Sequence, residues 1–232
     1  ALKQVVRHAF VQAESRITTP ADAEALLAAG HADTVSIVRG QIADPWLAAK
    51  AQAGRPDDIR PCIACNQLCW GRRARDYWIS CLVNPSAGRE FEWGGDRFEP
   101  ADRPRRILVV GGGPAGLEAA RVAASRGHRV TLIEREAELG GRFRLAARQP
   151  AREKIARLLD WHRHQRLQLQ VELRLGQEAT PADLAGYDEV ILATGARPAR
   201  DGYQRAFPDR LCLPGVDLPD VFDIEDILAD QP

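Results

Sequence analysis

Methionine is missing from this chain of 232 residues, and neither sign of charge is in excess. The 32 lysines and arginines are balanced by 32 aspartates and glutamates, so the formal net charge at pH 7 is zero. Proteins that bind the phosphate backbone of nucleic acids need a one-sided basic surface, and this balance argues against that function. We therefore expect a small molecule, and no nucleic acid, as the partner.

Long hydrophobic runs are also missing. The longest uncharged stretch of apolar and small residues, 107–117, is far shorter than the roughly 20 residues that span a bilayer. No basic segment followed by an apolar stretch opens the chain, so no secretory signal is recognised. We expect no membrane partner and a cytoplasmic location. Because no element closes the sequence at residues 226–232, we also expect a piece of a longer polypeptide.

The first part of the chain is predicted to form two strand–helix units. Residues 9–13 and 34–38 are strand candidates, and helices are expected to begin after Thr19 and to cover residues 45–53. The signals around the first helix are clear, because Thr19 can cap its amino end and Gly30 can end it. Two such units in succession are typical of the end of a (β/α)8 barrel or of an open parallel sheet.

An arginine follows each of these two strands. Arg16 and Arg39 lie where the last loops of a (β/α)8 barrel frequently bind phosphate, together with Val38 and Gly40. The planar guanidinium group suits a phosphate because it donates several hydrogen bonds at once. Exposed salt bridges are the alternative role for both arginines.

Four of the five cysteines gather in a segment rich in Pro, Gly, Arg and Trp. Three fall within eight residues and the fourth follows after eleven more, at Cys62, Cys65, Cys69 and Cys81. Four convergent thiolates bind either an iron-sulfur cluster or a zinc ion. Three cysteines in one tight loop favour the cluster, since structural zinc sites usually consist of two separated pairs.

Regular periodicity returns at residue 106. A buried strand at 107–110, a helix at 114–126 and a strand at 129–133 make one βαβ unit. A longer amphipathic helix is expected over 151–165, followed by a polar–apolar alternation at 167–175. The apolar run 189–193 is a further strand.

A glycine motif occupies the turn between the first strand and helix of this unit. Gly111 allows a tight turn, Gly113 lets the backbone approach a diphosphate, and Gly116 allows close helix packing. Glu134, at the end of the next strand, is placed to accept hydrogen bonds from ribose hydroxyls. Such an acid disfavours a 2′-phosphate, so FAD, ADP or NAD fits better than NADP at this site.

Two downstream segments support the nucleotide site. Gly141 and Arg142 follow shortly after the ribose-binding acid, where glycine can pass beside a dinucleotide and arginine can pair with phosphate. Thr194 and Gly195 end the last strand at the same carboxyl edge of the sheet, where open α/β sheets bind their ligands.

The order of these parts resembles the multidomain iron-sulfur flavoproteins of the old yellow enzyme class, represented by bacterial 2,4-dienoyl-CoA reductase and trimethylamine dehydrogenase. The resemblance covers nearly the whole chain. It is carried by these segments: Ser15-Arg16-Ile17, Ala32-Asp33, Val38-Arg39, Ile42-Ala43-Asp44, Ile59-Arg60-Pro61-Cys62-Ile63 and Cys81-Leu82-Val83-Asn84-Pro85.

The resemblance implies three bound groups. By position, Arg16, Val38, Arg39 and Gly40 match residues that hold the phosphate end of FMN, and the four cysteines match the ligands of a 4Fe-4S cluster. The second nucleotide, FAD in the reductases and ADP in the amine dehydrogenases, is matched by Ala115, Glu134, Arg142 and Ala179. Arg142 replaces the Gln expected in the dienoyl-CoA reductases, which keeps both nucleotides open.

The resemblance also implies a function. We expect an oxidoreductase of the ene-reductase class that passes electrons between NAD(P)H and a conjugated, 2,4-dienoyl-CoA-like substrate. An amine dehydrogenase with ADP in the second site is the alternative within the family. A zinc-stapled nucleotide-binding scaffold without a redox role is the alternative outside it. The acid–base residues of the reaction are expected to precede residue 1, and the oligomeric state is left open.

The expected fold is α/β in three segments. Residues 1–54 would form the last two βα units of the FMN-binding (β/α)8 barrel, and 55–105 the iron-sulfur segment and linker. Residues 106–232 would form an incomplete Rossmann-like domain for FAD or ADP.

Overall fold

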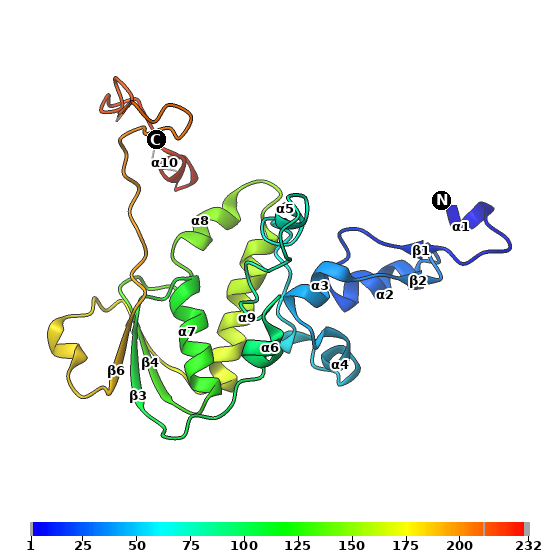
Figure 1. The fold of residues 1–232 in the computed structure, drawn as a ribbon, viewed down its shortest axis with the longest axis horizontal. Coiled ribbons are helices and arrows are strands. Elements are labelled where there is room, and N and C mark those ends of the chain that lie inside the picture. The colour runs from blue at the N-terminus through cyan, green and yellow to red at the C-terminus, as the bar shows by residue number, and fades with distance from the viewer. Residues whose placement is uncertain (1, 211, 230–232) are drawn as a thin grey trace.

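The computed structural model describes residues 2–210 and 212–229, so residue 1 of the predicted first segment and residues 211 and 230–232 of the third lie outside the described part. The carboxyl-terminal half is built on a parallel sheet of order β5-β4-β3-β6 (Figure 1). Its strands are β3 (Arg106–Val110), β4 (Arg129–Glu134), β5 (Glu172–Leu175) and β6 (Glu189–Leu192). All three pairings are parallel, and the two central strands are rich in branched apolar residues that suit a buried sheet.

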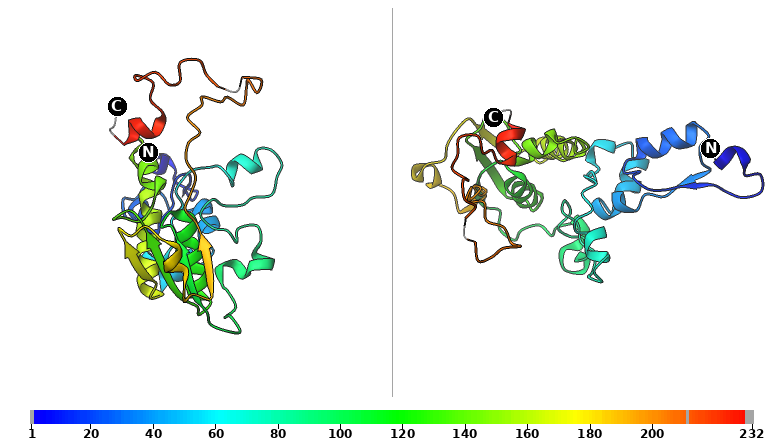
Figure 2. Two further views of the ribbon diagram at one scale, coloured as in Figure 1. Left: turned by 90° about the vertical axis from the view of Figure 1, so that its left-hand side faces the viewer. Right: turned by 90° about the horizontal axis from the view of Figure 1, so that it is seen from above.

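Two helices cover one face of this sheet, as Figures 1 and 2 show. They are α7 (Pro114–Ser125) and α9 (Lys154–Gln168). Leu117 and Leu159 from these helices join Val109 and Leu132 from the strands in one buried core. The predicted βαβ unit is therefore confirmed.

Two predicted boundaries in this half are wrong. The long helix begins at Lys154 instead of residue 151 and continues to Gln168. The alternation at 167–175 consequently yields a strand only from Glu172, because its first residues complete the helix. Shorter elements complete this half: α8 (Arg142–Arg148), η3 (Pro181–Leu184) and α10 (Ile224–Leu228).

The amino-terminal part extends away from the sheet (Figure 1). Its elements are α1 (Leu2–Val5), β1 (Gln12–Ala13), α2 (Pro20–Ala28), β2 (Thr34–Val35), α3 (Val38–Ala43) and α4 (Leu47–Gln52). The two strands pair in parallel. Thr19 caps α2, its hydroxyl accepting from the Asp22 N–H at 3.0 Å, as predicted.

Both strands in this part are shorter than predicted. They form two residue pairs and no more, because each has a single partner and an isolated two-stranded unit is marginal. The chain turns into α3 already at Val38, the residue predicted to end the second strand. Arg39 and Gly40 therefore lie in the first turn of a helix.

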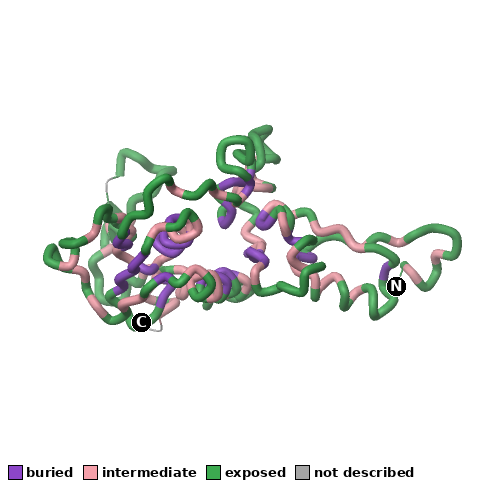
Figure 3. The backbone as a smooth tube through the Cα atoms, turned by 90° about the horizontal axis from the view of Figure 1, so that it is seen from below, coloured by how far each residue is buried: buried purple, intermediate pink, exposed green. Residues whose placement is uncertain are grey.

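The cysteine-rich segment between the two parts is largely irregular. It holds only η1 (Pro56–Asp58), α5 (Trp70–Arg73), α6 (Glu90–Trp93) and η2 (Gly94–Asp96). It nevertheless contributes to a second core, where Ile63 and Val83 pack with Ile155, Leu158 and Trp161 of α9. Figure 3 shows buried residues in this segment and around the sheet. No described helix is long and apolar enough to cross a membrane.

Candidate nucleotide and cysteine sites

The turn from β3 into α7 is closely packed at Gly111 and, within the first turn of the helix, at Gly116, but it is open at Gly113. A Cβ on Gly111 would lie 2.3 Å from the Ala193 carbonyl oxygen, and one on Gly116 would lie 1.9 Å from the Gly111 carbonyl oxygen. Gly111 also has a φ of +108°, which side chains disfavour. A Cβ on Gly113 would meet nothing within 4 Å. The loop is thus compact on its protein side and accessible at the amino end of α7.

Glu134 ends β4 directly beside this loop and is 8% exposed. Its Oε2 accepts a hydrogen bond from the Gly112 N–H at 2.6 Å, and its Oε1 accepts one from the Glu136 N–H at 2.9 Å. Each carboxylate oxygen has a further lone pair, so these two bonds orient the group without exhausting it. The carboxylate therefore holds the glycine loop in place at the position expected for a ribose-binding acid.

The segment after Glu134 returns to the glycine loop. The Gly140 N–H donates to the Gly112 carbonyl at 2.8 Å, and Gly141 adopts a φ of +50° next to Gly113. Arg142 begins α8, and its Nε lies 2.9 Å from Glu225 of α10. The structure thus pairs this arginine with a carboxylate, whereas the sequence suggested a phosphate.

The remaining predicted nucleotide residues lie at the same edge of the sheet. Ala115 is exposed in the first turn of α7, and Thr194 and Gly195 follow β6, whose end is bonded to β3 through Ala193 and Val110. Ala179 lies in the loop after β5. The carboxyl ends of all four strands therefore bring the predicted set to one edge.

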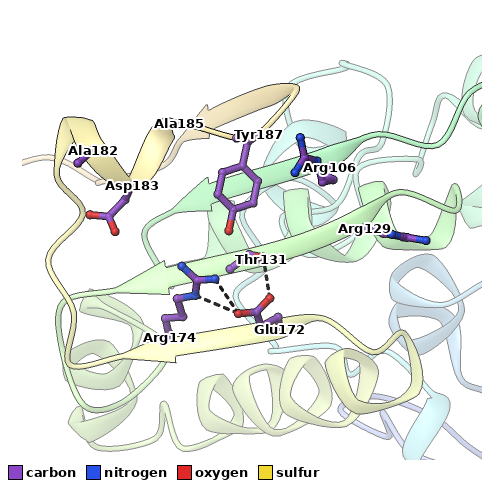
Figure 4. A pocket seen from close by; sticks show the side chains of 10 residues that line it. Arg106, Arg129, Thr131, Glu172, Arg174, Ala182, Asp183, Ala185 and Tyr187 are labelled. Atoms are coloured by element: carbon purple, nitrogen blue, oxygen red, sulfur yellow. Dashed lines mark hydrogen bonds and ion pairs between the residues drawn. The ribbon is translucent and has the colours of Figure 1, made fainter.

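A different hollow lies on the opposite edge. This depression, of about 480 Å³, lies near the amino ends of the strands. Figure 4 shows the side chains that line it, among them Arg106 and Arg129. Inside it, Glu172 accepts from the Thr131 hydroxyl at 3.1 Å and pairs with Arg174 at 2.9 Å. Because it faces away from the glycine loop, it is not part of the nucleotide site.

The four clustered cysteines line one cavity. Arg39 and Asn66 also line it, with apolar walls from Ile42 and Leu68 among others. The loop that carries the first three cysteines is shaped by left-handed residues, Asn66 at φ +56° and Ala64 at φ +55°. The structure therefore brings together all four thiols that the spacing had grouped, and it leaves the exposed Cys212 apart.

Hydrogen bonds and a cation act on two of these thiols. Burial raises the pKa of Cys62, and the Ala64 N–H and the nearby Arg39 guanidinium oppose that rise. Burial likewise raises the pKa of Cys81, against N–H groups from Val83 and Asn84. N–H donors aimed at sulfur favour the thiolate, the form that binds metals.

The thiols do not close on a single ion. Among residues 2–210 and 212–229, no group of three or more His, Cys, Asp or Glu side chains is arranged to hold one metal ion. Four thiols around one cavity suit either an iron-sulfur cluster or a zinc ion, so both alternatives stay open.

The residues predicted to hold an FMN phosphate are only partly brought together. Arg16 is exposed with a φ of +59°, while Gly40 is buried, and a Cβ on Gly40 would lie 3.0 Å from the Thr18 carbonyl oxygen. The segment that follows β1 and carries Arg16 therefore lies next to the first turn of α3, which carries Gly40. Val38 is exposed at the start of α3, but the Arg39 side chain turns to Asn66 and the cysteine cavity.

Sequence reasoning missed a buried ionic cluster between the cysteine segment and α7. Arg60 and Arg121 share the carboxylates of Asp96 and Glu118, and both guanidinium groups stack on the Trp161 ring. Apart from the position of Arg60 beside a cysteine, no sequence signal marks this set, because its members are separated by up to 101 positions.

Comparisons with known proteins place these features in context. The family described as pyridine nucleotide-disulphide oxidoreductase matches residues 94–206. The N,N-dimethylglycine/sarcosine dehydrogenase of Chromohalobacter salexigens is 42% identical over 85% of this chain and 28% of its own length. The cinnamate reductase of Clostridium sporogenes is 34% identical over 99% of this chain and 32% of its own length.

A solved structure is also similar. The 6-hydroxypseudooxynicotine amine oxidase from Pseudomonas geniculata N1 superimposes with a TM-score of 0.90 at 37% identity, covering 99% of this chain and 35% of that protein. The chain thus spans about a third of the length of the relatives that it matches.

Proposed function

Because the chain belongs to the iron-sulfur flavoproteins that resemble old yellow enzyme, we propose that it is part of an oxidoreductase that passes electrons between NAD(P)H and a small conjugated enoyl substrate. The observation that carries the proposal is the pairing of two sites within one packed unit. Residues of α8 and α9 pack both in the core under the sheet and in the core that includes three of the cysteines.

The cysteine cavity is the proposed site of a 4Fe-4S cluster. Its four thiols line one space, and N–H groups point at Cys62 and Cys81. Arg39 would offset part of the negative charge of the thiolates. The apolar walls, including Ile63 and Val83, would keep water away from the sulfurs.

The carboxyl edge of the sheet is the proposed site of FAD or ADP. The N–H groups at the start of α7 would bind the diphosphate, with Gly113 allowing close approach, and Glu134 would accept from the ribose hydroxyls. FMN is proposed to bind through Arg16 and the first turn of α3. When bound, the flavins would supply two-electron chemistry and the cluster one-electron transfer between them.

The three segments would then have separate roles. Residues 1–54 would belong to the FMN barrel, 55–105 to the cluster segment and 106–232 to the second nucleotide domain. The second core joins the cysteine segment to α9 by apolar contacts, so the second and third segments would act as one packed unit.

An amine dehydrogenase is the second candidate. It is favoured by Arg142, which takes the place of an expected glutamine, and by the amine-oxidising relatives. The two candidates differ in the second nucleotide and in the electron donor. Bound FAD and reduction by NADPH would support the reductase, while bound ADP without a response to NADPH would support the dehydrogenase.

The first experiment is metal and sulfide analysis of the full-length protein, prepared without oxygen. About four irons and four sulfides per chain are expected, with loss of both in Cys65→Ala. Cys212→Ala is the matched control, because that thiol is exposed and lies outside the cavity, and it should keep the full content. One zinc without sulfide would refute the proposal.

A further inference from the structure

Arg60 is a buried cation two residues before Cys62. Its side chain is 1% exposed, and its backbone N–H donates to Asp44 at 2.8 Å. Its Nη1 donates to the Asn84 Oδ1 at 3.1 Å. The guanidinium group therefore joins the chain segment before Cys62 to the segment after Cys81.

Asn84 completes this connection at the sulfur. Its backbone N–H donates to the Cys81 thiol, and its Nδ2 donates to the Ile42 carbonyl at 2.9 Å. Thus one side chain is held by Arg60 while the backbone of the same residue binds a thiol. Cys62 and Cys81 lie 19 positions apart in the sequence. The hydrogen bond from Arg60 to Asn84 connects the two segments that carry them.

The other end of the guanidinium group reaches the nucleotide half. Nη2 lies 3.1 Å from Asp96 and 3.3 Å from Glu118 on α7. The guanidinium carbon lies 4.7 Å from the centre of the Trp161 ring on α9. Arg60 consequently holds the cysteine segment against the helix that begins at the glycine loop.

Stability alone is a poor explanation for this arrangement. Buried ion pairs often stabilise no more than well-packed apolar residues, because both charges lose their hydration. The Arg60 Nε is buried without a hydrogen-bond partner, which adds a desolvation cost. A directional group with fixed bonds to three segments is better suited to setting their positions.

We propose that Arg60 is a positioning residue of the cysteine site. Through Asn84 it sets the position of Cys81 relative to Cys62 and keeps the N–H of Asn84 directed at the Cys81 sulfur. The inference rests on the proposed cluster. Hydrogen bonds to cluster sulfurs and nearby charge both set the reduction potential. Loss of a cation and of an N–H···S bond both disfavour the reduced, more negative state.

The test compares Arg60→Met with Arg121→Met in the full-length protein prepared without oxygen. Arg121 is the matched control, because it is 6% exposed and shares both carboxylates but makes no bond to Asn84. Arg60→Met should lose at least half of its iron and sulfide. Its remaining cluster should show a more negative midpoint potential and a changed EPR spectrum.

Arg121→Met should keep the wild-type potential and spectrum even where its melting temperature falls. Arg60→Lys should bring the midpoint potential back toward the wild-type value, since lysine keeps the positive charge. It should not restore the wild-type spectrum, since lysine lacks the planar set of N–H donors of a guanidinium group. If Arg60→Met does not fold, Asn84→Leu removes the same bond and should give the same spectral change.

Wild-type potential and spectrum in the Arg60 or Asn84 variant would overturn the positioning role. So would equal shifts in the Arg121 variant, because they would assign the effect to the ionic cluster as a whole. A wild-type protein without iron and sulfide would instead refute the proposed function, which keeps the two failures distinguishable.

Discussion

Gly113, the N-cap of α7, and Gly116, within its first turn, belong to one glycine motif but are expected to respond in opposite ways to alanine. A Cβ on Gly116 would lie 1.9 Å from the Gly111 carbonyl oxygen, whereas real Cβ atoms essentially never approach closer than 3.0 Å. Helix α7 would therefore have to move by about 1 Å. Overpacking of this kind costs about 1–3 kcal/mol, which lowers the melting temperature by about 2–4 °C per kcal/mol in a domain of this size.

Gly113→Ala should leave stability nearly unchanged. Gly113 has a φ of −74°, which alanine adopts readily, and the added methyl group meets no protein atom within 4 Å. That empty space is where a diphosphate would approach the amino end of α7. Alanine should therefore weaken nucleotide binding by at least tenfold, a cost of about 1.4 kcal/mol, while the fold stays intact.

Thermal unfolding of the nucleotide-free protein and calorimetric titration with ADP separate the two effects. We expect Gly116→Ala to lose stability and, as a consequence, affinity, and Gly113→Ala to lose affinity alone. Wild-type affinity in Gly113→Ala would show that no ligand approaches the loop there. A Gly116→Ala protein as stable as wild type would refute the packing argument for α7.

Three further variants test the buried polar groups. Glu134→Gln leaves one acceptor oxygen for the two N–H groups of Gly112 and Glu136, so unfolding free energy should fall by about 1–3 kcal/mol. Nucleotide affinity should fall with it, as denaturant titration and calorimetry would measure. Burial lowers the pKa of His162 from 6.5 to about 4, so the unfolded chain takes up a proton that the folded one excludes, and stability should decrease by about 3 kcal/mol from pH 6.5 to 4. His162→Gln should flatten that part of a stability–pH curve, and an unchanged slope would contradict the assignment. Trp161→Phe removes the indole donor to the Asp58 carbonyl, which keeps its bond from Lys50, so chemical denaturation should show a loss of about 0.5–1.5 kcal/mol; no loss would mean that the bond is weak in solution.

The nucleotide half was the more predictable from sequence because its signals are local. A buried strand, a glycine turn and a helix follow one another within 20 residues, and the structure places β3, the loop and α7 accordingly. The amino-terminal strands were overpredicted, since strand length depends on pairing partners that a local pattern does not contain. Val38, β-branched and therefore expected in a strand, instead begins a helix.

In the candidate site too, the features that depend on local sequence were predictable and those that depend on distant residues were not. The cysteine spacing correctly grouped four thiols in one cavity, because close sequence spacing limits how far ligands can separate. The partner of Arg39 was not predictable in this way. Its guanidinium meets Asn66, 27 residues later, and the partner of Arg142 is Glu225, 83 residues later. Such pairs follow from tertiary packing, which a single sequence does not display.

Helix α8 connects the two candidate sites physically. Its N-cap residue, Gly141, lies next to Gly113, and Phe143 in its first turn packs against both apolar cores. Further along, Ala146 and Ala147 pack in the core that includes three of the cysteines. A close-packed interior transmits small displacements, so a shift of the glycine loop should also displace the cysteine thiols. Perturbing the loop with Gly116→Ala should accordingly alter the spectrum of a bound cluster, whereas Gly113→Ala, which displaces no protein atom, should not.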